Sequence, residues 1–407
     1  MRLVFKKIAA AVLAVVLAAS LCGCDRGYIM TVDGMDIRNG IYISFLETAY
    51  SRAQEELEKQ NADIIAPADD DDTPADDETE EESVPITKET IRGKTGSQWI
   101  KDETMKAVRR FVAIQRKCDE LGLTLTDEEL GEINSDVTST WDDENAYVQY
   151  LYGYATMGEY YESRGIGQES MREILKVNAL QDKLFLHYYG KGGEFEVTDS
   201  EINDYLKETY ATVKLMNFTY TDASGKALES DADKKAVKDR AQEYADRINN
   251  GEKLVDVYYD YEIKNAEDSA AAKYNADTAG GLSKDEWIKK QVEAAGIEKA
   301  KSEDELDRYV NKETSSLGEK VTNYIFSAPV DGKAVVVEGE NGVYLVVKDD
   351  VTKKTAFKEE NYEGILTNIK GDDFQSMVDL FGQNYEVVAD ENLVNNKYGP
   401  EILDKKK

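Results

Sequence analysis

The first 21 residues constrain this chain more than any other stretch. Arg2, Lys6 and Lys7 form a basic start, and residues 8–21 are almost entirely apolar. An apolar run of this length is too short to cross a bilayer comfortably and is typical of a secretory signal peptide. The rest of the chain is therefore expected to fold and act outside the cytoplasm.

The residues at the end of this run resemble the lipobox of bacterial lipoproteins. Leu21 stands three residues before Cys24, and the small residue Gly23 stands directly before it. The resemblance implies cleavage after residues 1–23 and lipidation of Cys24. More than one acyl chain at Cys24 gives stable anchoring, so we expect an extracytoplasmic protein that is lipid-anchored to the cell membrane. The alternatives are an ordinary signal peptide and a helix that is not cleaved.

Composition argues against several classes of function. The 407 residues include 82 acidic and 50 basic ones, a formal net charge of −32, which disfavours nucleic acid as a partner. Once Cys22 is cleaved off and Cys24 is lipidated, Cys118 alone is left, so no disulfide can form within the chain. His187 is the sole histidine, which argues against histidine-rich metal sites and a Ser-His-Asp hydrolase. We expect no metal and no cofactor.

Apolar periodicity predicts that the chain up to residue 212 is mainly helical. Residues 28–37 alternate around Asp33-Gly34, which predicts a small hairpin. The longest expected helices cover residues 39–60, 97–121 and 168–189. Capping-box sequences at Thr126 and Thr198 begin two more. Cys118 lies on the apolar seam of its helix, so we interpret it as a buried hydrophobe and not as a nucleophile.

Two segments depart from this pattern. Residues 61–90 contain blocks of aspartate and glutamate together with prolines, and such a run repels itself and cannot bury a core. It predicts a disordered loop, with weak Ca²⁺ binding or binding of a basic client as alternatives. Residues 145–162 contain six tyrosines. They indicate either helix packing at a partly wet interface or a groove that holds unfolded polypeptide.

The pattern changes after residue 212. Strands are expected at 213–220, 334–337, 342–348 and 385–388, and helices at 231–250 and 357–380. Residues 284–320 are polar and compatible with helix. The predicted fold class is α+β, with a mainly helical domain and a small α+β domain that contains an antiparallel sheet.

Four short motifs follow one another in an order that resembles a known family. They are VDGMDI at 32–37, ELGLTLTDEE at 120–129, VTDSEINDY at 197–205, and Gly280-Gly281-Leu282. With the order of elements after residue 212, they resemble the PrsA-type foldase lipoproteins and SurA-type periplasmic chaperones, which carry a parvulin (PpiC-type) prolyl isomerase domain. The resemblance implies a SurA-type helical domain at 24–212, a parvulin-like domain at 213–350, and a C-terminal helical segment at 351–407 that packs on the first domain.

The isomerase positions of that family are altered in this chain. The resemblance implies histidines in the first and last strands, where Asn217 and Tyr344 stand here, and Phe326 is expected as a wall of the proline pocket. Isomerisation lowers a rotation barrier of about 18–20 kcal/mol and needs no covalent chemistry. Asn217 and Tyr344 could still donate hydrogen bonds, but we expect a degenerate domain.

Three functions are left open. The first is a membrane-anchored chaperone or foldase that binds unfolded or newly secreted polypeptides, with little or no prolyl isomerase activity. The second is an active isomerase that uses Asn217, Tyr344 and Phe326. The third is a structural or assembly lipoprotein without catalysis. The missing histidines separate the first from the second, and client binding separates the first from the third.

Overall fold

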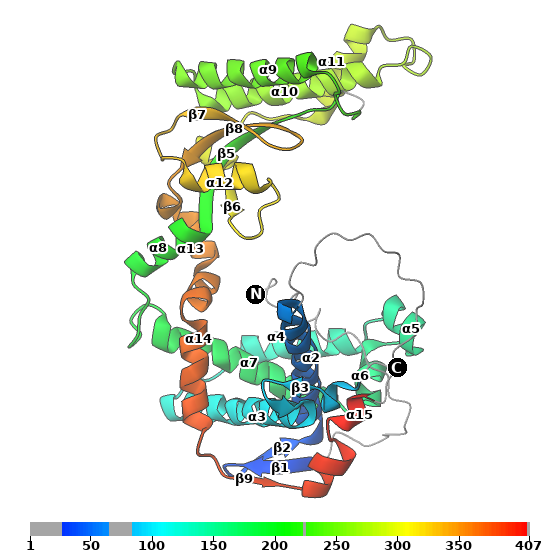
Figure 1. Cartoon of the computed structure of the whole chain (residues 1–407), viewed down its shortest axis with the longest axis vertical. Helices are drawn as coiled ribbons and strands as arrows, with labels where there is room; N and C mark the ends of the chain where they lie inside the picture. Colours follow the sequence, from blue (N-terminus) through cyan, green and yellow to red (C-terminus); the bar gives the residue numbers. More distant parts are fainter. Residues whose placement is uncertain (1–26, 65–83, 223–224, 405–407) are drawn as a thin grey trace. The chain divides into compact units, whose positions relative to one another are not determined.

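The computed structural model describes residues 27–64, 84–222 and 225–404. The predicted signal peptide, Cys24 and residues 65–83 of the acidic segment lie outside them. The described chain forms two compact units, one from its start to Glu196 and from Lys370 onward, the other over Val197–Ile369. Both combine helices with antiparallel strands, which confirms the predicted α+β class (Figure 1). Among the described residues, no helix has the length and apolar character needed to span a bilayer.

The first unit begins with the predicted hairpin. Asp33 and Gly34 both adopt positive φ, of 51° and 74°, as a tight two-residue turn requires. The elements of the unit are β1 (Tyr28–Val32), β2 (Met35–Arg38), α2 (Asn39–Ile64), η1 (Ile86–Lys88), β3 (Thr90–Ile91), β4 (Lys94–Thr95), α3 (Gly96–Leu121), α4 (Asp127–Trp141), α5 (Ala146–Tyr152), α6 (Met157–Ser163), α7 (Gln168–Tyr189), β9 (Val387–Ala389), η4 (Leu393–Lys397) and α15 (Glu401–Asp404).

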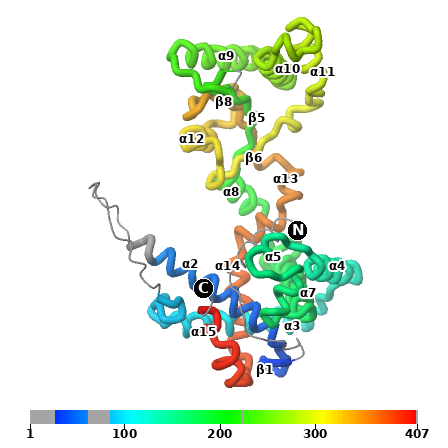
Figure 2. Tube along the Cα trace, turned by 90° about the vertical axis from the view of Figure 1, so that its right-hand side faces the viewer, coloured from blue at the N-terminus to red at the C-terminus, as the bar shows by residue number. Residues whose placement is uncertain are grey.

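Helices α2, α3, α4 and α7 make up the body of this unit (Figure 2). Their apolar stripes face one another: Leu46 of α2, Val108 of α3 and Leu184 of α7 are all fully buried. The end of the chain also belongs to this unit. Strand β9 pairs with β1, and the carboxylate of Asp404 accepts a 3.0 Å hydrogen bond from the Tyr50 hydroxyl.

The second unit is built on one antiparallel sheet in the order β6-β5-β8-β7. Its elements are α8 (Asp199–Thr209), β5 (Tyr210–Thr219), α9 (Asp231–Asn249), α10 (Leu254–Lys273), α11 (Lys284–Ala295), η2 (Glu303–Leu306), β6 (Arg308–Asn311), α12 (Glu319–Ser327), β7 (Ala334–Glu338), β8 (Gly342–Asp349), η3 (Val351–Lys353) and α13 (Thr355–Glu360). Helix α14 (Tyr362–Gly382) runs from this unit into the first.

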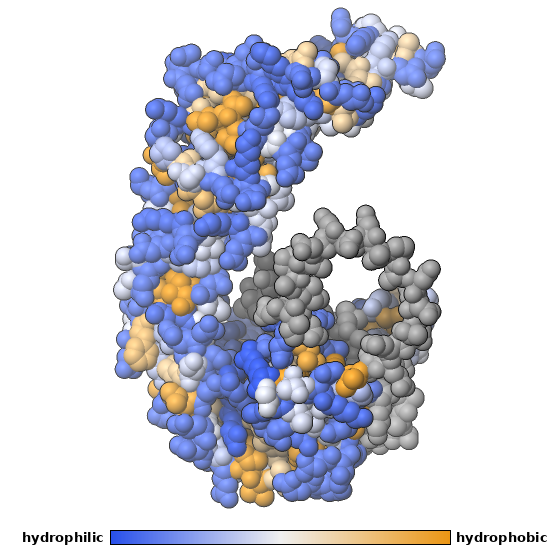
Figure 3. All heavy atoms as spheres, in the orientation of Figure 1, coloured by the Kyte–Doolittle hydropathy of each residue, from blue (hydrophilic) through white to orange (hydrophobic). Residues whose placement is uncertain are grey.

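Helices cover both faces of this sheet, so β5 is buried on both sides. Met216 and Phe218 pack under α9 and α10, whereas Val213 and Leu215 pack with Ile325 of α12. This alternation follows from the two-residue period of a strand. Figure 3 shows apolar residues gathered over β7 and β8, where Val335 is exposed.

The structure corrects several boundaries. The division falls at Val197 and not at residue 213, because α8 packs against β5 and η3. Of the segment 61–90 expected as a loop, residues 61–64 continue α2 and Ile86–Lys88 forms a 3₁₀ turn whose Thr87 is buried. The stretch 284–320, expected to be compatible with helix, is helical only in part: α11 ends at Ala295, and the short strand β6 follows.

Candidate functional site

One edge of β5 is only partly covered by a neighbouring strand. Strand β6 pairs with β5 from Tyr210 to Val213, whereas β8 pairs with the other edge as far as Thr219. Beyond Val213, the described residues supply no strand partner on the β6 side. An uncovered strand edge presents backbone groups to which an extended peptide can add.

A tyrosine hydroxyl from α10 occupies part of this edge. The Tyr261 hydroxyl accepts a 3.0 Å hydrogen bond from the backbone N–H of Asn217 and donates a 2.6 Å bond to the Asn217 carbonyl. Burial raises the pKa of Tyr261, so the hydroxyl keeps the proton that it donates. Both backbone groups of Asn217 therefore point away from β8, which makes Asn217 and its cross-strand partner Tyr344 a non-hydrogen-bonded pair with closely spaced side chains.

A pocket of about 560 Å³ opens beside this pair, and we call it the edge pocket. Its lining residues are Leu215, Asn217, Tyr258, Tyr261, Glu262, Asn265, Ile297, Arg308, Ser316, Leu317 and Tyr344. The rings of Tyr258 and Tyr261 are anchored in the core of the unit. A second pocket of about 510 Å³ shares Tyr258, Glu262 and Arg308 with it, so the two adjoin along α10. The lining mixes aromatic and aliphatic side chains with polar and charged ones, so the pocket can give a peptide both apolar contact and hydrogen bonds.

The structure brings together two of the three predicted site residues. Asn217 is exposed and Tyr344 is half-buried, and they lie opposite each other at the edge pocket. Phe326, on α12, packs against the same apolar cluster as Tyr344 but does not line that pocket. Its ring lies beneath the ammonium of Lys312, 5.7 Å from the ring centroid. The catalytic roles of these residues stay predictions.

The contribution of α10 to this pocket was not predicted from the sequence. Tyr258 and Tyr261 stand in a tyrosine-rich part of the sequence, and residues three apart share one face of a helix. That spacing was the available signal. Arg308 was missed for a different reason, because β6 is a four-residue strand of mixed polarity inside a polar stretch.

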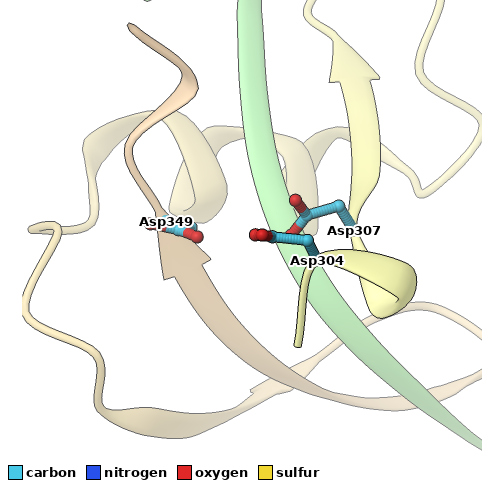
Figure 4. A group of neighbouring side chains, drawn as sticks. All are labelled: Asp304, Asp307 and Asp349. Atoms are coloured by element: carbon cyan, nitrogen blue, oxygen red, sulfur yellow. The ribbon is translucent and has the colours of Figure 1, made fainter. Parts of the chain in front are cut away.

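Within the part of the chain that the structure describes, one group of carboxylates has a spacing that could hold a metal ion, and it consists of three aspartates. Oxygens of Asp304, Asp307 and Asp349 lie within 4.8 Å of one another, and the three carboxyl groups point together (Figure 4). The ammonium of Lys354 lies 2.7 Å from each of them, and that of Lys214 lies 3.0 Å from Asp307 and 2.7 Å from Asp349. Two ammonium groups already offset two of the three negative charges and contact the same oxygens, so these residues are a poor fit for a divalent cation.

This cluster instead serves as an ion-pair network that shapes the pocket. Burial alone would favour the neutral form of Asp349, but hydrogen bonds from Lys214 and Lys354 hold its pKa well below the usual range. The network joins the residues before β6 to β5 and to the end of β8. It therefore fixes the start of β6, where Arg308 lines the edge pocket.

The lone cysteine and the lone histidine take no part in this site. Cys118 is fully buried in α3, and burial raises the pKa of its thiol to about 11. This agrees with its interpretation as a buried hydrophobe. His187 is exposed near the end of α7, with its ring edge-on to Tyr188.

No known family model matches the sequence, and no curated protein matches it. Three solved structures are similar in part. PrsA from Bacillus subtilis has 13% sequence identity and a TM-score of 0.26, covering 74% of this chain and 91% of that one. The foldase protein PrsA from Streptococcus pneumoniae has 12% identity and a TM-score of 0.30, covering 75% and 90%. The peptidylprolyl isomerase PrsA from Bacillus cereus has 14% identity and a TM-score of 0.24, covering 78% and 94%. Such low scores do not establish a common fold.

Proposed function

We propose that this protein is an extracytoplasmic chaperone, or foldase, that binds unfolded secreted polypeptides and has little or no prolyl isomerase activity. The observation that carries the proposal is the edge pocket. It combines a strand edge that β6 covers only as far as Val213, two anchored tyrosine rings and the exposed side-chain amide of Asn217. Such a surface offers an extended chain side-chain hydrogen bonds and apolar contact without demanding one sequence.

The proposal of weak isomerase activity rests on the chemistry of the paired positions. In the family that the motifs resemble, histidines are expected where Asn217 and Tyr344 form a cross-strand pair. An amide and a phenol can donate hydrogen bonds, but Phe326, the expected pocket wall, does not line the edge pocket. A proline bound in the edge pocket would meet the two polar side chains, but it would lack the aromatic wall expected from Phe326. An active isomerase is the second candidate, and a non-catalytic assembly lipoprotein is the third.

Export and anchoring belong to the same proposal. The basic start, the short apolar run and the lipobox-like residues before Cys24 support a lipid anchor at that cysteine. Labelling of the protein with a radioactive fatty acid in its host tests this. Incorporation that is lost in Cys24→Ala supports the anchor, and unchanged incorporation in that variant contradicts it.

The experiment for polypeptide binding fills the edge pocket. Asn217→Trp places a large side chain beside Tyr344, on a strand position that accepts aromatic residues. The matched control is Asn323→Trp, since Asn323 is exposed on α12 and does not line the pocket. We expect the unmodified protein and the control to suppress aggregation of a reduced, denatured secreted protein, and Asn217→Trp to do so poorly. Equal suppression by all three proteins would show that the edge pocket is not the binding site.

A further inference from the structure

Helix α5 in the first unit exposes an unusual amount of apolar surface. Of its seven residues only Val148 is buried, whereas Tyr150 is 86% exposed, Tyr147 53% and Leu151 43%. Asn145 caps the helix, accepting hydrogen bonds from the backbone N–H groups of Tyr147 and Val148. Tyr147, Tyr150 and Leu151 are three and four residues apart, so the short helix presents them on one face. Large apolar side chains that gather on an exposed surface commonly mark an interaction site.

Helix α6 lies beside α5 (Figure 1), and an aromatic layer joins the end of α5 to it. The ring of Tyr160 stacks on Tyr152 at 5.1 Å and meets Tyr154 edge-on at 6.1 Å. Arg164 donates a 2.7 Å hydrogen bond to the Tyr160 hydroxyl, and its guanidinium lies 4.9 Å over the Tyr160 ring. Arg164 is itself buried and paired with Glu47. The aromatic layer behind α5 is thus tied to the unit by stacking, a hydrogen bond and an ion pair.

The surroundings of α5 are acidic. Residues 142–163 contain five acidic residues and no lysine or arginine. Asp142, Asp143 and Glu144 are exposed directly before the helix. The next basic residue, Arg164, is committed to Glu47 and Tyr160. Exposed tyrosine faces beside uncompensated carboxylates favour a ligand that carries both cationic and apolar side chains.

We propose that the α5 surface, formed by Tyr147, Tyr150 and Leu151 with the acidic rim at 142–144, binds cationic, apolar segments of unfolded polypeptide. The proposal rests on the proposed function and names the class of segment that a second site, apart from the edge pocket, would take. Lysine and arginine stems cover tyrosine faces while their charges meet the acidic rim. Leucine and tryptophan side chains of the segment pack on Tyr150 and Leu151.

The test uses a fluorescent twelve-residue peptide without proline, in which lysine and arginine alternate with leucine and tryptophan. Its match carries glutamate at every basic position. We expect the purified protein to bind the cationic peptide at least about tenfold more tightly than the acidic one, and its affinity to fall as salt rises. Equal binding of the two peptides, or no salt dependence, would overturn the proposal.

Variants locate the site. Tyr150→Ser with Leu151→Ser removes exposed side chains only, and we expect the affinity for the cationic peptide to fall about tenfold or more. The control, Leu380→Ser with Val388→Ser, removes side chains of the same unit that are 62% and 59% exposed, and it should bind as the unmodified protein does. If both double variants bind alike, the α5 surface is not the site.

This outcome is separable from failure of the proposed function. The peptide lacks proline and is too short to report on client aggregation. A protein that suppresses aggregation but binds the peptide equally well with and without Tyr150 and Leu151 refutes the α5 site alone. A protein that binds the peptide through α5 but never suppresses aggregation keeps the site and refutes the chaperone.

Discussion

Replacing Lys214 by methionine tests whether the ion-pair network stabilises the second unit. Its ammonium lies 3.0 Å from Asp307 and 2.7 Å from Asp349, and only 4% of the residue is exposed. Two opposite unit charges about 3 Å apart attract by roughly 5 kcal/mol at an effective dielectric constant of about 20, although desolvation offsets much of this attraction. Removing one partner of a buried pair typically costs about 3–5 kcal/mol. Because Lys354 still contacts all three carboxylates, we expect Lys214→Met to cost about 3 kcal/mol.

The assay is urea-dependent hydrogen exchange in peptides from β5 and β8, which report on the second unit. The matched control is Lys235→Met, which removes a pair with Asp239 that is largely exposed on both sides and should cost less than about 0.5 kcal/mol. The lowered pKa of Asp349 adds a pH dependence. The ionised Asp349 carboxylate contributes its full stabilisation at pH values above its unfolded-state pKa of about 3.9. This stabilisation is lost as the pH falls from that value through the lowered folded-state pKa, so the cost of Lys214→Met becomes smaller in acid. A cost at neutral pH no larger than that of the control would refute this reasoning.

Three further predictions concern single positions. Tyr261→Phe removes both hydrogen bonds to the Asn217 backbone and should destabilise the second unit by about 1–3 kcal/mol in the same exchange assay. The control Tyr259→Phe, at a half-buried position, should change the stability little. Equal exchange curves for the two variants would contradict this prediction. Cys118 should react with a thiol reagent at pH 8 only after urea unfolding, because burial raises its pKa to about 11; rapid reaction of the folded protein would show that the thiol is accessible. Gly158→Ala would place a Cβ 2.3 Å from a ring carbon of Trp141 and should cost about 1–3 kcal/mol of stability, measured by urea unfolding with tryptophan fluorescence. The control Gly131→Ala, on open helix surface, should stabilise the protein by up to about 1 kcal/mol. A similar change in stability for both variants would be inconsistent with tight packing at Gly158.

The sequence allowed the helices of the first unit to be predicted well, because local signals agree there. The capping box at Thr126 starts α4, as the one at Thr198 starts α8 in the second unit, and Gly122 ends α3 with φ of 67°. The seam that includes Cys118 proved to be the buried face of α3. In each case propensity, capping and periodicity favour the same structure.

The sequence could not predict the edge pocket, because its parts come together only through long-range pairing. Asn217 and Tyr344 were singled out separately, but their direct pairing depends on the register of β5 against β8. The short strand β6 carries one buried residue, Val310, and its place is set by the ion pairs of Asp307. Such pairs between residues distant in sequence leave no local pattern that a single sequence can reveal.

The surface of α5 is a different case. The tyrosines between residues 145 and 162 had two interpretations, and the structure supports packing for Tyr160, which is buried, but leaves Tyr150 exposed. Both residues lie in short helices of seven residues, where an apolar stripe is too brief to show which side faces the core.

The central claim is that the protein binds unfolded polypeptide without appreciable catalysis of proline isomerisation. Exchange NMR of an unstructured peptide with one X-Pro bond measures both properties in a single sample, without a coupling protease. We predict that adding the purified protein broadens the peptide resonances, which reports binding, while the cis–trans exchange rate stays at its protein-free value. Acceleration that disappears in Asn217→Ala and Tyr344→Ala would identify an active isomerase and contradict the claim. Sharp resonances at every protein concentration would contradict polypeptide binding itself.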